Sequence, residues 1–400
     1  MLNKEILENI RIIDLGTVIA GPQCAGLLGD FGAEVIKVER PKNGDPARRL
    51  APMKDGASLW WKVMNRNKKS ITLNLKSKKG NELMRKLVEQ SDVLIENFRP
   101  GVLEKLGLSW EQLQAINPNL ILLRISGYGQ TGPKASLPSF GRAAEAYSGV
   151  QYITGFPDGP PVHAGFSMAD SVTALMGAYG VSLALYERQF NNKGGQVIDL
   201  ALFESLFRLV EFPVAMYDQL NKIQERKGNQ HPGSQPINTY KTKDNQWITI
   251  SAATDQTAKR FLKAIGGDEL ANDPRFITNE KRVENIEVLD RIIKKWMLNR
   301  TFSEIEKLLH ENDAAFYSKV MNMQDLFESD HIRAREGIVS VEDDDFDELK
   351  MQGVVPKFSR TAGKVKHTGP KLGEHNLEVY SKLCGIDKDE LSKLKDENVI

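Results

Sequence analysis

Strand-like and helix-like segments alternate along the first third of the chain. Residues 10–15 are rich in β-branched side chains, a small-residue helix is expected over about 21–31, and residues 34–39 have a second strand pattern. A strand, a helix and a second strand in this order predict a βαβ unit with parallel strands and a right-handed crossover. The alternation continues with strands 71–75, 93–96 and 120–126 and with helices 80–90 and about 110–116. We therefore predict an α/β fold with a Rossmann-like, doubly wound parallel sheet.

The remaining chain is long enough for a second domain, since 400 residues exceed what one ordinary core uses. A helix over about 171–188, a strand at 196–200 and a further helix at 203–220 are expected to complete the large domain, residues 1–220. Residues 221–236 are polar and rich in turn formers, which is typical of a linker. A hairpin and three helices follow the linker, so we predict a smaller α+β domain over 237–335.

Charge and hydropathy restrict the partners of the chain. Lys and Arg number 54 against 53 Asp and Glu, which leaves no overall field for binding nucleic acid or an anionic membrane. No run of 18 apolar residues appears, so we expect no transmembrane helix, and the charged first residues lack the pattern of a signal peptide. We therefore expect a cytoplasmic enzyme or binding protein.

Metal binding is not expected either. Cys24 and Cys384 form no metal-finger spacing, and none of the six histidines lies four residues from another.

The turn after the first strand, residues 16–23, matches no common nucleotide motif. Gly16 and Gly21 have the spacing of a phosphate loop, but Pro22 and Gln23 stand where Lys and Ser or Thr are required. Glu39 lies where the ribose-binding acid of a dinucleotide fold would be, although the glycines of that motif are missing. A tight turn into a close-packed helix is therefore the simpler interpretation.

Basic residues recur just after predicted strands. Arg40, Lys76 and Arg99 each follow a strand end, Arg99 next to Phe98, and Lys105 comes from a neighbouring loop. Ligands of open α/β sheets bind at this edge, where cations beside an aromatic ring suit several phosphates and a purine. Solvated surface charges are the alternative.

Residues 159–186 contain one acidic residue, Asp170, and no Lys or Arg. Asp170 lies where the long helix is expected to begin, so it is either an N-cap, contributing about 1 kcal/mol, or a reachable nucleophile or base. No second carboxylate lies nearby in the sequence, which argues against an acid–base pair.

Several stretches together resemble the class III CoA-transferase family, which includes formyl-CoA:oxalate and crotonobetainyl-CoA:carnitine CoA-transferases and is related to the α-methylacyl-CoA racemases. The resemblance rests on residues 11–15, 20–22, 26–41, 65–71, 96–101, 126–133 and 369–375, in the family's order over essentially the whole chain. It implies a large domain completed by residues 336–400, a small domain, and an interlocked ring homodimer.

The resemblance also implies the site. Asp170 matches the catalytic aspartate, which forms an anhydride with the acyl group and then a β-aspartyl-CoA thioester. The positions that match the family's CoA contacts are Val18, Ile19, Ala20, Arg40, Leu73, Lys76, Asn97, Phe98, Arg99 and Lys105. CoA and acyl-CoA are then substrates, together with a small carboxylic acid, and no permanently bound cofactor or metal is expected.

The sequence departs from the family's pattern at two places. The racemases' histidine would fall at Phe140, which carries no proton, so a racemase is the weaker alternative. The glycine run of oxalate-using members reads Gly228 to Gln235, with Gly233 inside it; His231 and Gln235 are candidates for contacting another acid. A non-catalytic acyl-CoA-binding protein is the third alternative, and the presence of Asp170 argues against it.

Overall fold

The computed structural model describes residues 5–191 and 193–400, which divide into two compact units. The first, here called the sheet unit, comprises the chain up to residue 150 together with 164–214 and 331–400. The second, the small unit, comprises residues 151–163 and 215–330. The predicted linker, 221–236, and residues 151–163 and 215–220, predicted for the large domain, thus lie in the small unit, whereas 331–335, predicted for the small domain, lie in the sheet unit.

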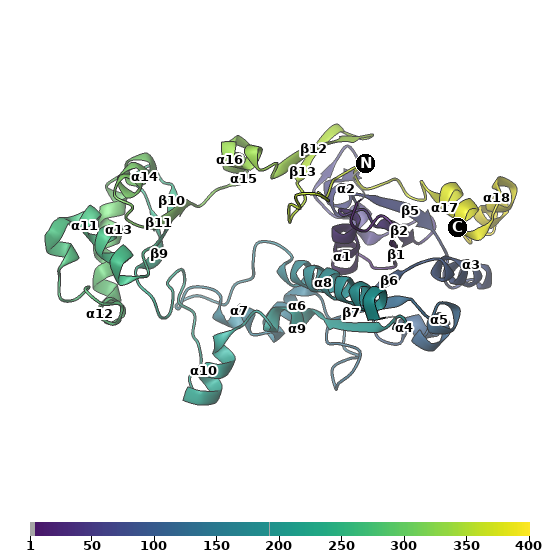
Figure 1. The fold of residues 1–400 in the computed structure, drawn as a ribbon, viewed down its shortest axis with the longest axis horizontal. Coiled ribbons are helices and arrows are strands. Elements are labelled where there is room, and N and C mark those ends of the chain that lie inside the picture. The colour runs from purple at the N-terminus through teal and green to yellow at the C-terminus, as the bar shows by residue number, and fades with distance from the viewer. Residues whose placement is uncertain (1–4, 192) are drawn as a thin grey trace. The chain divides into compact units, whose positions relative to one another are not determined.

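A six-stranded parallel sheet forms the centre of the sheet unit (Figure 1). Its strands are β1 (Arg11–Asp14), β2 (Glu34–Glu39), β5 (Lys68–Thr72), β6 (Val93–Glu96), β7 (Ile121–Ser126) and β8 (Val197–Ala201), in the spatial order β5-β2-β1-β6-β7-β8. The predicted α/β fold with a parallel sheet is confirmed. β5 begins three residues earlier than predicted, because its polar residues Lys68 and Ser70 are buried and hide the strand pattern.

Helices cover both faces of this sheet. One face carries α1 (Ala20–Gly29), α6 (Gly141–Tyr147), α8 (Met168–Asn191) and α9 (Leu202–Phe207). The other carries α3 (Lys78–Glu89), α5 (Trp110–Ile116), α17 (Asn376–Cys384) and α18 (Lys388–Asp396). Every strand of the sheet except β5 contributes to both cores, since successive side chains such as Ile12 and Ile13 point to opposite faces.

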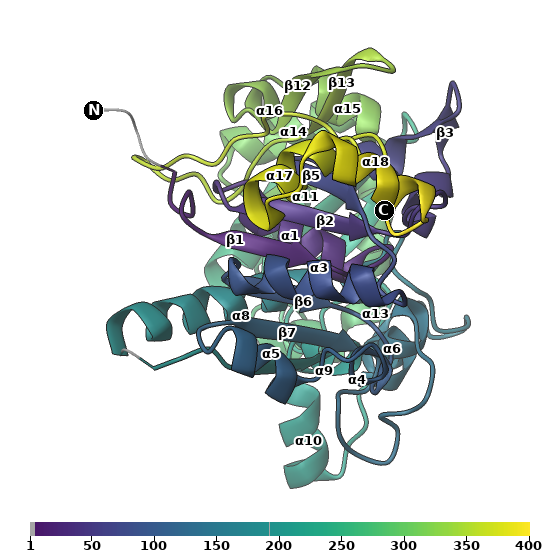
Figure 2. The same cartoon turned by 90° about the vertical axis from the view of Figure 1, so that its right-hand side faces the viewer.

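The C-terminal residues complete the second of these layers. α17 packs on α3 and β5, as Figure 2 shows. The Tyr380 hydroxyl donates to the Thr72 carbonyl at 2.8 Å, and the backbone N–H of Asn74 donates to the carbonyl of Val399 at 2.7 Å. Residues far apart in the sequence thus share one core.

α8 differs from its prediction in where it begins. It starts at Met168 instead of about 171, which moves Asp170 from the N-cap into the first helical turn. Gly177 lets α1 approach closely, since a Cβ there would lie 3.0 Å from the Sγ of Cys24. By length and composition α8 could cross a membrane, yet its small-residue face is buried in the sheet unit.

The short elements of the sheet unit connect these layers. They are η1 (Pro46–Arg49), β3 (Met53–Lys54), β4 (Ala57–Ser58), α2 (Leu59–Met64), α4 (Val102–Lys105), β12 (Ile338–Asp343) and β13 (Asp347–Gln352). Three helices run across unit boundaries: α7 (Val150–Ile153), α10 (Phe212–Leu220) and α16 (Asp330–Ala334). The single helix expected over 203–220 is therefore two helices, of which α9 is partly buried and α10 has no buried residue.

The small unit is built on an antiparallel sheet in the order β11-β10-β9. Its strands are β9 (Ile237–Lys241), β10 (Trp247–Ser251) and β11 (Phe316–Lys319), and the first two form the predicted hairpin. Its helices are α11 (Asp255–Ala271), α12 (Asn279–Glu284), α13 (Ile286–Leu298), α14 (Phe302–Glu311) and α15 (Met323–Glu328). A separate apolar core, with Phe261, Phe276 and Ile293 fully buried, holds this sheet and its helices together.

Candidate active site

The strand order reverses between β1 and β6, and loops leaving such a point diverge and open a crevice at the carboxyl edge of the sheet. Two hydrogen bonds join the loops here: the backbone N–H of Thr17 donates to Oδ1 of Asn97 at 2.7 Å, and Nδ2 of Asn97 donates to the Thr17 carbonyl at 2.9 Å. Asn97 therefore uses its side chain to hold the first turn in shape.

The turn itself has an unusual backbone. Val18 has a φ of 65°, in the left-handed region that a β-branched residue rarely adopts. Its backbone N–H donates to Oδ1 of Asp45 at 3.1 Å. Such conformations cost about 1–3 kcal/mol and occur mainly where function needs a prebuilt shape.

Buried charges beneath the turn compensate for this strain. Nζ of Lys68 donates to Asp14 at 2.9 Å and to the carbonyl of Pro22 at 2.6 Å, while Lys37 pairs with Asp45 at 3.1 Å and donates to the carbonyl of Gly16. Both lysines are almost fully buried. Because each buried cation has a carboxylate partner, the turn is held by several charge-assisted bonds.

A cavity of about 440 Å³ opens beside this turn, wholly within the sheet unit. Four of the predicted CoA contacts line it: Arg40, Leu73, Lys76 and Phe98. Its other lining residues include Leu15, Val38, Val102 and Leu106, which give it an apolar floor. Its volume and its mixture of apolar wall and cationic rim are those of a small-molecule site.

Of the other predicted contacts, Val18, Ile19 and Ala20 form the adjoining turn and the start of α1, with Ala20 buried. Arg99 and Lys105 do not line the cavity, but they stand on its margin, next to Phe98 and at the end of α4.

The predicted CoA-binding cations differ from other cations of the sheet unit in lacking partners among the described residues. Arg40, Lys76, Arg99 and Lys105 are exposed, and in the part of the chain that the structure describes their side chains make no ion pair or hydrogen bond. Arg48, by contrast, is bound by both oxygens of Glu39, at 2.7 Å each. Four unpaired cations at one edge attract a ligand with several phosphates.

Glu39 holds structure rather than a ribose. It is buried, and besides Arg48 it accepts hydrogen bonds from the Ser70 hydroxyl at 2.6 Å and the Asp45 backbone N–H at 2.9 Å.

Glu96 has a similar role at the end of β6, where it accepts from the Phe98 backbone N–H at 2.6 Å and from Arg124 at 2.8 Å. Neither role was apparent from the sequence, because the partners lie on separate strands.

Asp170 lies at the same edge of the sheet. In a parallel sheet the crossover helices begin near the carboxyl ends of the strands, and both α1 and α8 are such helices, packed against each other. An ideal Cβ on Gly141, the first residue of α6, would lie 2.5 Å from Oδ2 of Asp170, so any larger residue there would displace the Asp170 carboxylate. Burial, and then the nearby charge of Glu145, raise the pKa of the Asp170 carboxyl from 3.8 to about 6.

Glu145 is a second carboxylate that the sequence analysis missed. It lies on α6, 25 positions before Asp170, and only 2% of its surface is exposed. Its position four residues after Gly141 places both on one face of the helix, but only the packing of α6 against α8 shows that this face meets Asp170.

Phe140 precedes α6 directly and is 79% exposed. It therefore stands beside the glycine that contacts Asp170, where a racemase would need a proton carrier.

The remaining predicted substrate contacts belong to the small unit. His231 and Gly233 are exposed, and Nδ1 of His231 accepts from the Gly233 backbone N–H at 3.2 Å. Gln235 is buried, donates to the His231 carbonyl at 2.9 Å and accepts from the Ile237 backbone N–H at 3.0 Å. Its side chain thus serves to close this loop.

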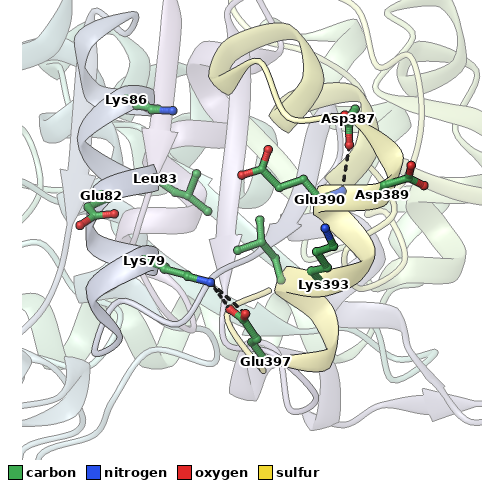
Figure 3. Close-up of a pocket in the computed structure, with 10 residues that line it drawn as sticks. Lys79, Glu82, Leu83, Lys86, Asp387, Asp389, Glu390, Lys393 and Glu397 are labelled. Atoms are coloured by element: carbon green, nitrogen blue, oxygen red, sulfur yellow. Dashed lines mark hydrogen bonds and ion pairs between the residues drawn. The ribbon is translucent and has the colours of Figure 1, made fainter.

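A second hollow, about 640 Å³, lies between α3 and α18 (Figure 3). Nζ of Lys79 forms an ion pair across it with Oε2 of Glu397, at 2.6 Å. The acids Glu82, Asp387, Asp389, Glu390 and Glu397 outnumber the lysines Lys79, Lys86 and Lys393. This lining repels phosphates, and none of the predicted site residues belongs to it. In residues 5–191 and 193–400, no group of three or more His, Cys, Asp or Glu is placed to hold a metal.

Comparisons with known proteins identify the family of this chain. A family model described as CoA-transferase family III matches residues 7–376. The chain is 43% identical over 395 residues to a succinyl-CoA–D-citramalate CoA-transferase of Chloroflexus aurantiacus, covering 98% of each. It is 41% identical over 398 residues to the beta subunit of a succinyl-CoA–L-malate CoA-transferase of the same organism, again covering 98% of each.

A solved structure of similar fold is a CAIB/BAIF family protein from Brucella suis. It has a TM-score of 0.85 and 31% sequence identity, covering 95% of this chain and 99% of that one. The resemblance stated from the sequence is confirmed.

Proposed function

The chain belongs to CoA-transferase family III and is a CoA-transferase, and from this premise we propose that it moves CoA from an acyl-CoA thioester to a free carboxylic acid through covalent intermediates on Asp170. The observation that carries the proposal is the Asp170 carboxylate itself. It lies at the carboxyl edge of the sheet, against the backbone of Gly141, with a pKa raised to about 6. It is therefore ionised at neutral pH and more basic than an ordinary aspartate.

The reaction exchanges one carboxylate for another in four balanced steps. An oxygen of Asp170 attacks the thioester carbonyl of the donor, the carbon–sulfur bond breaks, and CoA leaves as a thiolate. The thiolate attacks the Asp170 acyl carbon of the resulting anhydride and releases the donor acid, which leaves an aspartyl-CoA thioester. The acceptor carboxylate attacks that thioester, again expelling the thiolate. The thiolate then attacks the acceptor's acyl carbon, and Asp170 is regenerated.

The cavity beside the first turn supports CoA binding at the same edge. Its apolar floor, with Leu73 and Phe98, suits a purine ring, and Arg40 and Lys76 suit phosphates. Binding energy from the nucleotide, which takes no part in bond exchange, holds the thioester in line with Asp170.

For the acyl pair we propose succinyl-CoA as donor and a hydroxylated dicarboxylic acid as acceptor. The support is the two relatives at 43% and 41% identity, whose names give succinyl-CoA with D-citramalate and with L-malate.

We also propose that the protein self-associates. Leu175, Tyr179, Leu183, Tyr186 and Phe190 are 51–68% exposed and recur every three or four residues along α8. This spacing forms one continuous apolar stripe, here called the α8 stripe. The relative named as a beta subunit supports assembly from more than one chain, and a second copy of this chain is the proposed partner.

The test of the reaction is intact-protein mass spectrometry after mixing with succinyl-CoA, followed by hydroxylamine. We expect a CoA-sized adduct on wild type and on Asp158→Ala, an exposed-aspartate control, and none on Asp170→Ala. The adduct should disappear with hydroxylamine. Wild-type turnover or an adduct in Asp170→Ala would contradict the covalent mechanism.

A further inference from the structure

α6 presents a small, partly polar face to its neighbours. Gly141, Ala144, Glu145 and Ser148 recur at the spacing of one helix face, and α6 packs against α8 and α9. Ala144, Glu145 and Ser148 are buried, Glu145 to 2% exposure. Glu145 therefore places a carboxylate inside a packed helix interface rather than at the surface.

Glu145 and Asp170 share the interface between α6 and α8. Gly141 fixes the contact, because the position of a Cβ there lies 2.5 Å from Oδ2 of Asp170. Glu145 lies one turn further along the same face of α6. The two carboxylates are therefore neighbours across helices, although 25 positions separate them in the sequence.

The elements packed against α8 hold few other charges that face Asp170. The titratable or charged groups on or directly after them are Cys24 on α1, Arg124 on β7, Asp199 on β8, Glu204 on α9, Arg208 at the C-cap of α9, and Arg142, Glu145 and Tyr147 on α6. Arg142, Glu204 and Arg208 are exposed, and burial raises the pKa of the Cys24 thiol, which keeps it uncharged.

Two further groups are already bound: Arg124 is paired with Glu96 and Glu104, and Asp199 accepts from the backbone N–H of Gln130. Glu145 is the one charged side chain among the described residues that raises the pKa of Asp170.

We propose that Glu145 is a positioning residue of the transfer reaction: its carboxylate, on the buried face of α6 that packs against α8, acts on Asp170 and tunes the reactivity of that nucleophile. This inference rests on the proposed function, since it concerns the same nucleophile.

The chemistry explains why such tuning is useful. A carboxylate is a weak nucleophile toward a thioester, and attack becomes faster as the carboxylate becomes more basic. In each step the Asp170 carboxylate and a substrate carboxylate compete for the same acyl group or for CoA. When the two carboxylates are similarly basic, neither side is strongly favoured and every step stays reversible. A negative charge held nearby in a low-dielectric interface supplies that basicity without touching the substrate.

The test is the pH dependence of kcat/KM for succinyl-CoA in Glu145→Gln. This change removes the charge while keeping the size and shape of the side chain. The acid limb, expected near pH 6 in wild type, should move down by roughly half to one pH unit. At pH 8 the rate of adduct formation should fall about two- to three-fold, because the nucleophile is less basic.

Two further variants separate charge from structure. Glu145→Asp keeps the charge and should leave the acid limb within about 0.3 unit of wild type. Glu204→Gln removes an exposed carboxylate from neighbouring α9 and should change neither the limb nor the rate. An acid limb that stays in place in a folded, active Glu145→Gln would overturn the inference.

If Glu145→Gln does not fold, Glu145→Asp and Glu145→Ser decide the question. The acid limb should stay in place in Glu145→Asp, which keeps the charge, and should move down in Glu145→Ser, which loses it. The same acid limb in both variants would contradict the proposal. Failure of the covalent mechanism would look different, because wild type itself would then form no adduct on Asp170.

Discussion

Single side chains carry the chemistry of this protein through their surroundings. Asp170 is an ordinary residue type whose carboxyl is made more basic by burial and by Glu145. Arg40 and Lys76 are ordinary surface cations that become ligand-binding candidates because they line one cavity and their side chains find no partner in residues 5–191 and 193–400. The same residue types elsewhere, such as Arg48 with Glu39, serve structure alone.

Asp170→Asn should abolish transfer and stabilise the fold at alkaline pH. The folded-state pKa of Asp170, about 6, lies above its ordinary 3.8, so its contribution to stability is complete below pH 3.8 and is lost as pH rises through 6. At pH 8 the ionised carboxylate therefore destabilises the fold, and removing it should raise the free energy of unfolding by roughly 1–2 kcal/mol, after allowance for partial solvation.

Urea unfolding at pH 8 and pH 4, followed by tryptophan fluorescence, measures this difference. The stabilisation should shrink to a small fraction at pH 4, where the folded-state carboxyl is protonated and the unfolded-state carboxyl is near its midpoint of 3.8. An equal gain at both pH values would show that Asp170 carries no buried charge.

At the scale of elements, the first βα turn is a rigid part of the site. Its left-handed Val18 is held by Asp45, the buried lysines hold the carbonyls around it, and Asn97 joins it to the end of β6. The turn and the cavity wall that follows β6 are therefore one structural piece, which positions a ligand without having to move.

Asn97→Ala removes the bonds between these two loops. We expect the KM for the acyl-CoA to rise about five- to fifty-fold, with kcat changed less, because the CoA site loses its shape while Asp170 is untouched. Steady-state kinetics checks this, with Asn119→Ala, an exposed asparagine of the sheet unit, as control. A fall in kcat alone would show that Asn97 acts on the chemical step.

At the scale of the whole molecule, two units and an exposed stripe require explanation. Each unit has its own apolar core, and the C-terminal residues belong to the sheet unit through α17. The α8 stripe leaves five large apolar side chains in water, which single-chain proteins rarely do in one contiguous patch.

Leu183→Glu should therefore convert the proposed dimer to monomer. A charge in the middle of the α8 stripe would be desolvated on association, which costs several kcal/mol. Light scattering after gel filtration measures the mass, and Gln189→Glu, which places the same charge on α8 outside the stripe, is the control. A monomeric wild type contradicts self-association, and binding of wild type to lipid vesicles would identify the stripe as a membrane surface instead.

Local patterns in the sequence determined much of the fold. The strands β2 and β6, the helix α5 and the hairpin of β9 and β10 lie where predicted, because alternation, helix caps and turn residues act over a few neighbours. The family and the position of Asp170 also followed from the sequence, since both rest on the identity of residues in order.

The tertiary structure decided what depends on residues meeting across space. β5 was misplaced because the partner that buries Lys68 is Asp14, 54 positions away. Asn97 binds the turn after β1, and Glu145 lies beside Asp170. The sequence could not show either contact, because the partners are far apart along the chain. A buried charge looks like any surface charge in a sequence, and only packing, by removing its water and choosing its partner, gives it a role.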